Sequence, residues 1–184
     1  MEWAQTQEAQ PYIKESHFID NDLERIRLQD MGMTLIHTAA EEEGFNANQY
    51  VELAQQLRNS DRLSTSFRFT AGESKLDPKS RANLIKLAGV IDQGEFDGQE
   101  ILLVGFTDSN GRTIKNAALG QARADEVRKF LANVIDAEAI KKVKLVAMSF
   151  GELLPLSCNT TAEGRSRNRR VEVWVRTPAD TATN

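Results

Sequence analysis

The sequence of 184 residues predicts an α/β fold in which strands and helices alternate along residues 62–176. Three observations favour it: short β-rich runs recur, amphipathic helical stretches separate the first three of these runs, and turns containing Gly or Pro lie between the elements. The expected order is β-α-β-α-β-β. Both strand–helix–strand units should be right-handed crossovers between parallel strands.

The first half of this region contains a strand, a helix and a buried strand. Residues 66–70 (Ser-Phe-Arg-Phe-Thr) alternate in character and predict the first strand. A helix should begin after Asp77, a typical N-cap residue followed by Pro78 at the first helical position, and should end before Gly94. Residues 101–104 form a continuous apolar run, which is typical of a strand covered on both faces.

The second half contains a long helix and two further strands. The apolar spacing predicts a helix over residues 112–134 and a strand over residues 143–150. Residues 151–164 are polar and are expected to form a long loop. Residues 170–176 predict the fourth strand, in which Glu172 and Trp174 lie on the face opposite the three valines. Trp174 is interpreted as a packing residue.

Charge divides the chain into segments. The formal net charge is −4, but residues 1–60 carry 11 acidic and 4 basic side chains, whereas residues 61–184 carry 16 acidic and 19 basic ones. Such a break suggests segments of different origin. Residues 1–61 are interpreted as a partly helical linker or the tail of an upstream domain, residues 62–176 as the globular domain, and residues 177–184 as a polar tail.

Composition argues against several classes of protein. The most apolar stretch, residues 101–106, is far shorter than the roughly 20 residues that cross a bilayer, so no transmembrane segment is expected. A single cysteine, Cys158, excludes an internal disulfide framework and a multi-cysteine zinc site. Two histidines, His17 and His37, leave little material for histidine-centred catalysis. No metal or other cofactor is expected.

Polar residues gather where the strands are expected to end. Ligand sites in open α/β sheets lie at the carboxyl ends of the strands, and Asp108 follows the second strand. Asn116 and Arg123 are seven residues apart on the second helix, so they share a face. If the last strand is antiparallel to the others, Arg169 returns to the same edge and these four residues converge.

A fixed carboxylate beside a fixed guanidinium recognises a zwitterion such as the head of an amino acid. No nucleophile–base pair accompanies these residues, so the pattern favours binding over catalysis, and an enzyme is not expected. An alternative left open by spacing alone is that Asp108 and Arg123 simply pair with each other. Arg165 and Arg170 are expected to pair with acidic neighbours. An acidic chain without aromatic residues beside these arginines argues against nucleic acid as a partner.

Several ordered motifs resemble the signature of OmpA-like peptidoglycan-binding domains. They are residues 105–111 (Gly-Phe-Thr-Asp-Ser-Asn-Gly), Asn116, residues 119–127 (Leu-Gly-Gln-Ala-Arg-Ala-Asp-Glu-Val), Gly151-Glu152 with Pro155, and residues 163–173. The resemblance covers about residues 62–176. It implies a four-stranded mixed sheet whose last strand is antiparallel and lies between the first two, with the helices on one face.

The resemblance also implies a function and a site. The domain would bind peptidoglycan non-covalently through the diaminopimelate of the stem peptide, and would anchor a periplasmic or envelope protein of a diderm bacterium to the cell wall. Asp108 would hold the diaminopimelate ammonium group and Arg123 its carboxylate. Asn116 and Arg169 would support the ligand. Thr107 would shape the turn.

The loop after the first strand, with Gly72, also lines the site in this family, and here the sequence departs from the pattern. Thr70 stands where the family often has Asp, and Ala71 and Gly72 stand where Asn or Ser is common. Gly120 replaces a common Ser. Because this loop then offers mostly main-chain groups, the alternative function is a protein-interaction module of the envelope with a degenerate wall-binding site.

A second resemblance concerns the start of the chain. Residues 62–69 and the upstream residues 12–22 look like the junction in proteins that fuse a phosphate-type periplasmic substrate-binding domain to an OmpA-like domain. It implies that the chain is the C-terminal part of such a fusion.

Overall fold

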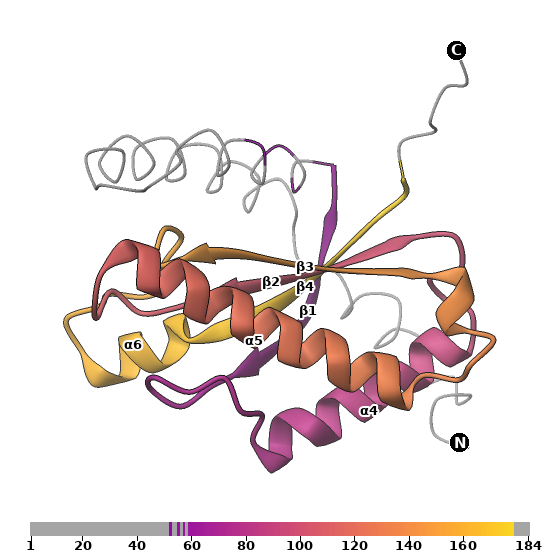
Figure 1. Cartoon of the computed structure of the whole chain (residues 1–184), viewed down its shortest axis with the longest axis horizontal. Coiled ribbons are helices and arrows are strands. Elements are labelled where there is room, and N and C mark those ends of the chain that lie inside the picture. The colour runs from indigo at the N-terminus through magenta and orange to yellow at the C-terminus, as the bar shows by residue number, and fades with distance from the viewer. Residues whose placement is uncertain (1–51, 53–54, 56, 58, 179–184) are drawn as a thin grey trace.

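The computed structural model describes residues 52, 55, 57 and 59–178. The predicted order of strands and helices is confirmed, with a short 3-10 turn and one further helix added (Figure 1). The elements are β1 (Asp61–Arg68), α4 (Pro78–Asp92), β2 (Glu100–Phe106), α5 (Thr113–Val134), η2 (Ile140–Lys142), β3 (Lys144–Gly151), α6 (Ala162–Asn168) and β4 (Arg170–Arg176).

The four strands form one mixed sheet in the order β1-β4-β2-β3. β4 is antiparallel to both β1 and β2, whereas β2 and β3 are parallel. The predicted position of the last strand, between the first two, is therefore confirmed. Register pairs join Glu100 to Arg176 at one end of β2 and Phe106 to Arg170 at the other. The carboxyl ends of β1, β2 and β3 consequently share an edge with the start of β4.

Both faces of the sheet are covered. α4 and α5 lie over one face (Figure 1), where they enclose the larger hydrophobic cluster. On the other face Trp174, which is 1% exposed, packs in a smaller cluster with Leu57, Phe106 and Leu154. All seven residues of β2 are buried, as its continuous apolar sequence predicts. Among the described residues no helix is long and apolar enough to span a membrane.

Two glycines bring α5 into direct contact with the sheet. A Cβ atom added to Gly105 in β2 would lie 2.0 Å from the carbonyl oxygen of Gly120 in α5. A Cβ atom added to Gly120 would lie 2.2 Å from Oγ of Ser149 in β3. The main chains of β2 and α5 are therefore in contact. This contact determines how closely the face of α5 that carries Asn116 and Arg123 packs against the sheet.

Capping residues determine where α4 and α6 begin. Asp77 caps α4 as predicted, because its side chain accepts a hydrogen bond from the Ser80 amide at 2.6 Å. The prediction of an unbroken loop over residues 151–164 is wrong, since α6 begins at Ala162. Thr161 caps that helix by accepting from the Gly164 amide at 3.0 Å. Arg165 and Arg167 thus lie in α6 and do not lead into β4.

Gly105→Ala is expected to lower the free energy of unfolding by about 1–3 kcal/mol, because a methyl group at this position overpacks the contact between β2 and α5. Urea denaturation measures the change. Gly89→Ala in α4 is the control, since its Cβ would meet no atom within 4 Å and Ala favours the helix by roughly 0.5–1 kcal/mol. Equal stability of Gly105→Ala and the unmodified chain would show that this contact does not set the position of α5.

Candidate functional site

Asp108 and Arg169 form an ion pair at the carboxyl edge of the sheet. Asp108 lies two residues after the end of β2 and is 6% exposed. Its Oδ2 accepts from Nη1 of Arg169 at 2.8 Å, and its Oδ1 accepts from the main-chain amide of Asn110 at 3.1 Å. Arg169 lies between α6 and β4 and also donates from Nε to the carbonyl of Phe69 at 3.1 Å. The antiparallel course of β4 thus brings together two residues 61 positions apart.

Arg123 lies beneath this pair and has no exposed surface. It donates from Nε to the carbonyl of Glu73 at 2.8 Å, from Nη1 to that of Phe106 at 3.1 Å and from Nη2 to that of Thr70 at 3.0 Å. The guanidinium carbon lies 5.4 Å from the centre of the Phe69 ring, within range of a cation–π contact. These partners compensate a buried charge that would otherwise be costly.

The burial has an electrostatic consequence. Burial foremost, with the neighbouring charge of Arg169, lowers the pKa of Arg123 to about 10, although Asp108 acts in the opposite direction. The guanidinium therefore remains protonated at neutral pH. Asp108 makes its ion pair with Arg169, so the simple alternative of a mutual Asp108–Arg123 pair is not what the structure contains.

The loop after β1 contributes main-chain groups to the site. The carbonyls of Thr70 and Glu73 accept from Arg123, as described above. Gly72, between them, has φ +71°, a conformation that favours glycine, and no atom would lie within 4 Å of an added Cβ. Thr70, Ala71 and Gly72 are exposed. The loop therefore holds Arg123 in place through carbonyl oxygens.

Asn116 belongs to a neighbouring group around Glu152. Its Nδ2 donates to one carboxylate oxygen of Glu152, and Thr113 Oγ1 donates to the other at 2.7 Å. Asn116 is 4% exposed and, as its spacing predicts, shares the buried face of α5 with Arg123. Within the described part of the chain no hydrogen bond joins Asn116 to Asp108 or Arg123. Sequence reasoning missed Glu152, although it stands in the Gly151-Glu152 motif.

Thr107 ties the ends of two strands together. Its amide donates to the carbonyl of Gly151 at 2.8 Å, which joins the end of β2 to the end of β3. Its Oγ1 is buried and has no hydrogen-bond partner in the described structure. Buried hydroxyl groups usually have a partner, so this atom offers an unused donor and acceptor next to Asp108.

A fully buried amide, which sequence reasoning also missed, orders the turn that carries Asp108. Asn168 Oδ1 accepts from the amides of Leu156 and Ser157 at 2.8 and 3.0 Å. Its Nδ2 donates to the carbonyl of Ser157 and to Oδ1 of Asn159, both at 2.8 Å. Asn159 Oδ1 in turn accepts from the amide of Ser109 at 3.3 Å. The loop before α6 is thereby linked to the residue after Asp108.

Arg165 and Arg170, near the start of β4, have structural partners. Arg170 donates from Nε to Glu172 at 2.6 Å, so its predicted pairing with an acidic neighbour is confirmed. The prediction for Arg165 is wrong, because it donates to the carbonyls of Asn159 and Thr160 at 2.9 and 3.2 Å. Cys158 is exposed. Residues 52, 55, 57 and 59–178 contain no cluster of His, Cys, Asp and Glu that could hold a metal ion.

The mixed β1-β4-β2-β3 sheet, with α4 and α5 over one face, defines an α/β domain of the OmpA-like class. The chain belongs to the OmpA family, whose model matches residues 68–169.

The chain is similar to several envelope proteins. It is 34% identical to outer membrane porin F of Pseudomonas aeruginosa over 118 residues, which are 64% of this chain and 32% of the porin. It is 30% identical to the peptidoglycan-associated lipoprotein of Pseudomonas putida over 61% of this chain and 63% of the lipoprotein. The crystal structure of the peptidoglycan-associated lipoprotein from Burkholderia pseudomallei matches with a TM-score of 0.53 at 25% identity, covering 60% of this chain and 89% of that one. The chain thus spans about a third of the porin.

Asn168→Ala is expected to lower the free energy of unfolding by about 1–3 kcal/mol, because the main-chain amides of Leu156 and Ser157 lose the fully buried side chain that accepts from them. Hydrogen exchange at these two amides should accelerate as well, and both effects are measurable by denaturation and NMR. Asn110→Ala is the control, since Asn110 is exposed and only its main-chain amide is hydrogen-bonded. Unchanged exchange in Asn168→Ala would contradict the role of this amide.

Proposed function

We propose that this domain binds peptidoglycan non-covalently through the diaminopimelate of the stem peptide, and anchors an envelope protein to the cell wall from the periplasm. Membership of the OmpA family supports this function. So does the similarity to a protein named peptidoglycan-associated lipoprotein, both in sequence and in fold.

The observation that carries the proposal is the Asp108–Arg169 pair at the sheet edge, with the charge of Arg123 beneath it. The free end of diaminopimelate bears an ammonium group and a carboxylate on one carbon atom, so it needs an anion and a cation a few ångströms apart. A carboxylate offers about four lone-pair sites, and the described contacts of Asp108 use two of them. The others are available to the ligand's ammonium group.

The two guanidinium groups supply the positive pole. Arg123 is proposed to bind the ligand's carboxylate once the exposed loop at residues 70–72 moves aside, since Arg123 itself has no exposed surface. Arg169, whose side chain is 15% exposed, supports the carboxylate from the open side. An arginine has five N–H donors. Arg123 gives three of them to carbonyls and Arg169 gives two to Phe69 and Asp108, so each keeps donors for a carboxylate.

Neighbouring residues would shape the site. Asn116, held by Glu152, is proposed to contact the peptide at its amides. Thr107 is proposed to set the turn, and its unpartnered hydroxyl adds a polar contact. The loop at Gly72 would line the site through its main chain. We propose no catalytic role, because the carboxylate of the site is held by a guanidinium and no nucleophile accompanies it.

Asp108→Ala and Arg169→Ala are expected to weaken binding to purified sacculi about 10–150-fold, the loss that removal of a charge-assisted contact produces. Co-sedimentation measures the binding. Asp125→Ala and Arg128→Ala are charge-matched controls, because these residues form a half-exposed ion pair on α5. Sacculus binding that is unaffected in both site variants would refute the proposed site.

Arg123 needs a different variant, since its removal takes a donor from three main-chain carbonyls and empties a fully buried position. Arg123→Lys keeps the charge but removes the fork that holds these carbonyls. Its binding should be compared with its stability, so that a loss of ligand contact is distinguished from a loss of fold.

The exposed, largely main-chain loop at residues 70–72 favours one alternative, a protein-interaction module with a degenerate wall-binding site. Thr70→Asp restores the carboxylate that is common in the family at this position. If the site is degenerate, the unmodified chain stays in solution with sacculi and Thr70→Asp should bind them. If the site is functional, the unmodified chain binds sacculi without this carboxylate.

A further inference from the structure

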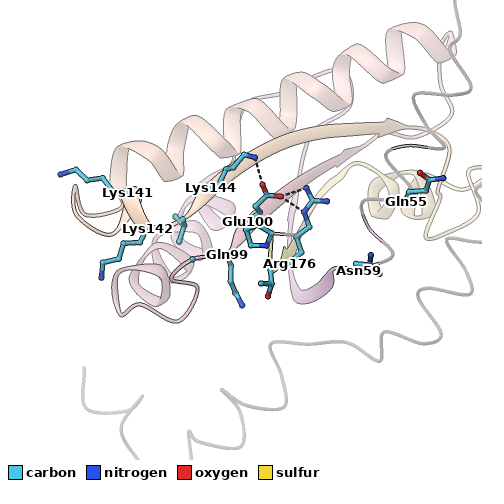
Figure 2. A pocket seen from close by; sticks show the side chains of 12 residues that line it. Gln55, Asn59, Gln99, Glu100, Lys141, Lys142, Lys144 and Arg176 are labelled. Carbon is cyan, nitrogen blue, oxygen red and sulfur yellow. Dashed lines mark hydrogen bonds and ion pairs between the residues drawn. The ribbon is translucent and has the colours of Figure 1, made fainter. Parts of the chain in front are cut away.

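A polar pocket lies at the end of the sheet opposite Asp108 (Figure 2). Its volume is about 740 Å³, and it forms where β2 and β3 begin and β4 ends, beside Gln55 and Asn59. Six residue steps of β2 separate Glu100 in this pocket from Phe106 at the other edge, about 20 Å in a strand. A ligand in this pocket would therefore leave the site around Asp108 unobstructed.

Cations dominate the lining. One carboxylate faces the pocket, Glu100, together with four basic side chains, Lys141, Lys142, Lys144 and Arg176. Volumes between roughly 300 and 1,000 Å³ are typical of sites for small ligands. The remaining polar lining consists mainly of the amide side chains of Gln55, Asn59 and Gln99, which donate as well as accept hydrogen bonds.

Glu100 does not neutralise this charge. Its side chain is only 8% exposed, and its two oxygens accept from Lys144 Nζ and Arg176 Nε, each at 2.6 Å. Lys144 foremost, with Arg176, holds the pKa of Glu100 below its usual value against the effect of burial. The carboxylate is thus ionised at neutral pH, and two cations share it. One positive charge remains in excess within this triad, in which Lys144 and Arg176 both converge on Glu100 (Figure 2).

Lys141 and Lys142 lie on the rim of the pocket. Their ion pairs, with Glu138 at 2.6 Å and Asp97 at 3.0 Å, involve carboxylates that are 78% and 39% exposed. Such exposed pairs are weak and screened by salt, so an entering anion can exchange with them. Each lysine ammonium has three N–H donors, of which these contacts use one. When Glu138 and Asp97 are counted with Glu100, the four basic side chains still outnumber the three carboxylates.

We propose that this pocket is a binding site for a phosphate group, carried either by a soluble compound or by a lipid headgroup. Lysine ammonium groups bind phosphate as point charges, and a phosphate near neutral pH carries more than one negative charge. Among the described lining residues, Val143 and Pro178 carry the larger apolar side chains. The four basic side chains of the lining therefore favour a negatively charged group as the ligand.

This site is independent of the proposed wall-binding site and goes beyond it. The domain would hold the cell wall at the edge of Asp108 and a phosphate-bearing component of the envelope at the opposite end of the same strands. Since β2 runs between them as a fully buried strand, both ligands can be bound at once.

The test is an NMR titration of the full chain with inorganic phosphate and, separately, with pyrophosphate. Each addition replaces an amount of sodium chloride that keeps the ionic strength constant. Saturating shifts of the amides of Gln99, Lys142 and Lys144 are expected at roughly 1–10 mM phosphate. Lys141→Gln with Lys142→Gln should weaken binding about three- to tenfold. This double variant leaves the Glu100 triad intact, so the sheet end should stay folded.

Lys75→Gln with Lys79→Gln is the matched control, because it removes the same charge from two exposed positions, one in the loop after β1 and one in the first turn of α4. Equal weakening by the control, or equal shifts with sodium chloride alone, would overturn the site. Co-sedimentation with phosphatidylglycerol–phosphatidylcholine vesicles, compared with pure phosphatidylcholine, distinguishes the sources. Pelleting that depends on Lys141 and Lys142 indicates a lipid headgroup, whereas pyrophosphate binding without pelleting indicates a soluble compound. Asp108→Ala should retain phosphate binding. A failure of the phosphate site can therefore be distinguished from a failure of the proposed wall-binding site.

Discussion

The insertion of β4, antiparallel, between β1 and β2 decides where the charged groups of this domain lie. At one end of the sheet it sets Arg169 beside Asp108, and at the other it sets Arg176 beside Glu100. Both pairs join residues more than 60 positions apart, so neither exists until the last strand is in place. Strand pairing of this kind closes long loops and is costly in chain entropy. The buried valines on one face of β4 and Trp174 on the other supply the compensating burial.

Buried guanidinium groups stabilise the edge that carries the site. Arg123 and Arg170 are both almost fully buried, and main-chain carbonyls accept from each of them. Arg170 also lies 3.8 Å from the centre of the Phe106 ring, on the side of the sheet away from α5. An arginine with five donors joins several loop carbonyls at once, which a smaller side chain cannot do. The loops at this edge are thus held by cations.

The contacts between α5 and the sheet connect packing with the site. Because Gly105 and Gly120 lack side chains, the main chain of α5 lies directly on β2. Asn116 is one turn before this contact and Arg123 one turn after it, so both side chains reach below the sheet edge and are buried. The glycine at position 120, where the resembling family commonly has serine, is accommodated by Ser149, whose Oγ fills the adjacent space.

The sequence by itself determined the order of the elements, the buried character of β2 and the face that Asn116 and Arg123 share, because periodicity and capping are local properties. The resemblance added the position of β4. Local patterns did not reveal α6, whose seven residues depend on one capping threonine, nor the roles of Glu152 and Asn168. Only the tertiary structure decided which charges meet: Asp108 pairs with Arg169 and not with Arg123. The reason is physical, since an ion pair depends on distance in space, and residues far apart in the chain acquire that distance only through packing.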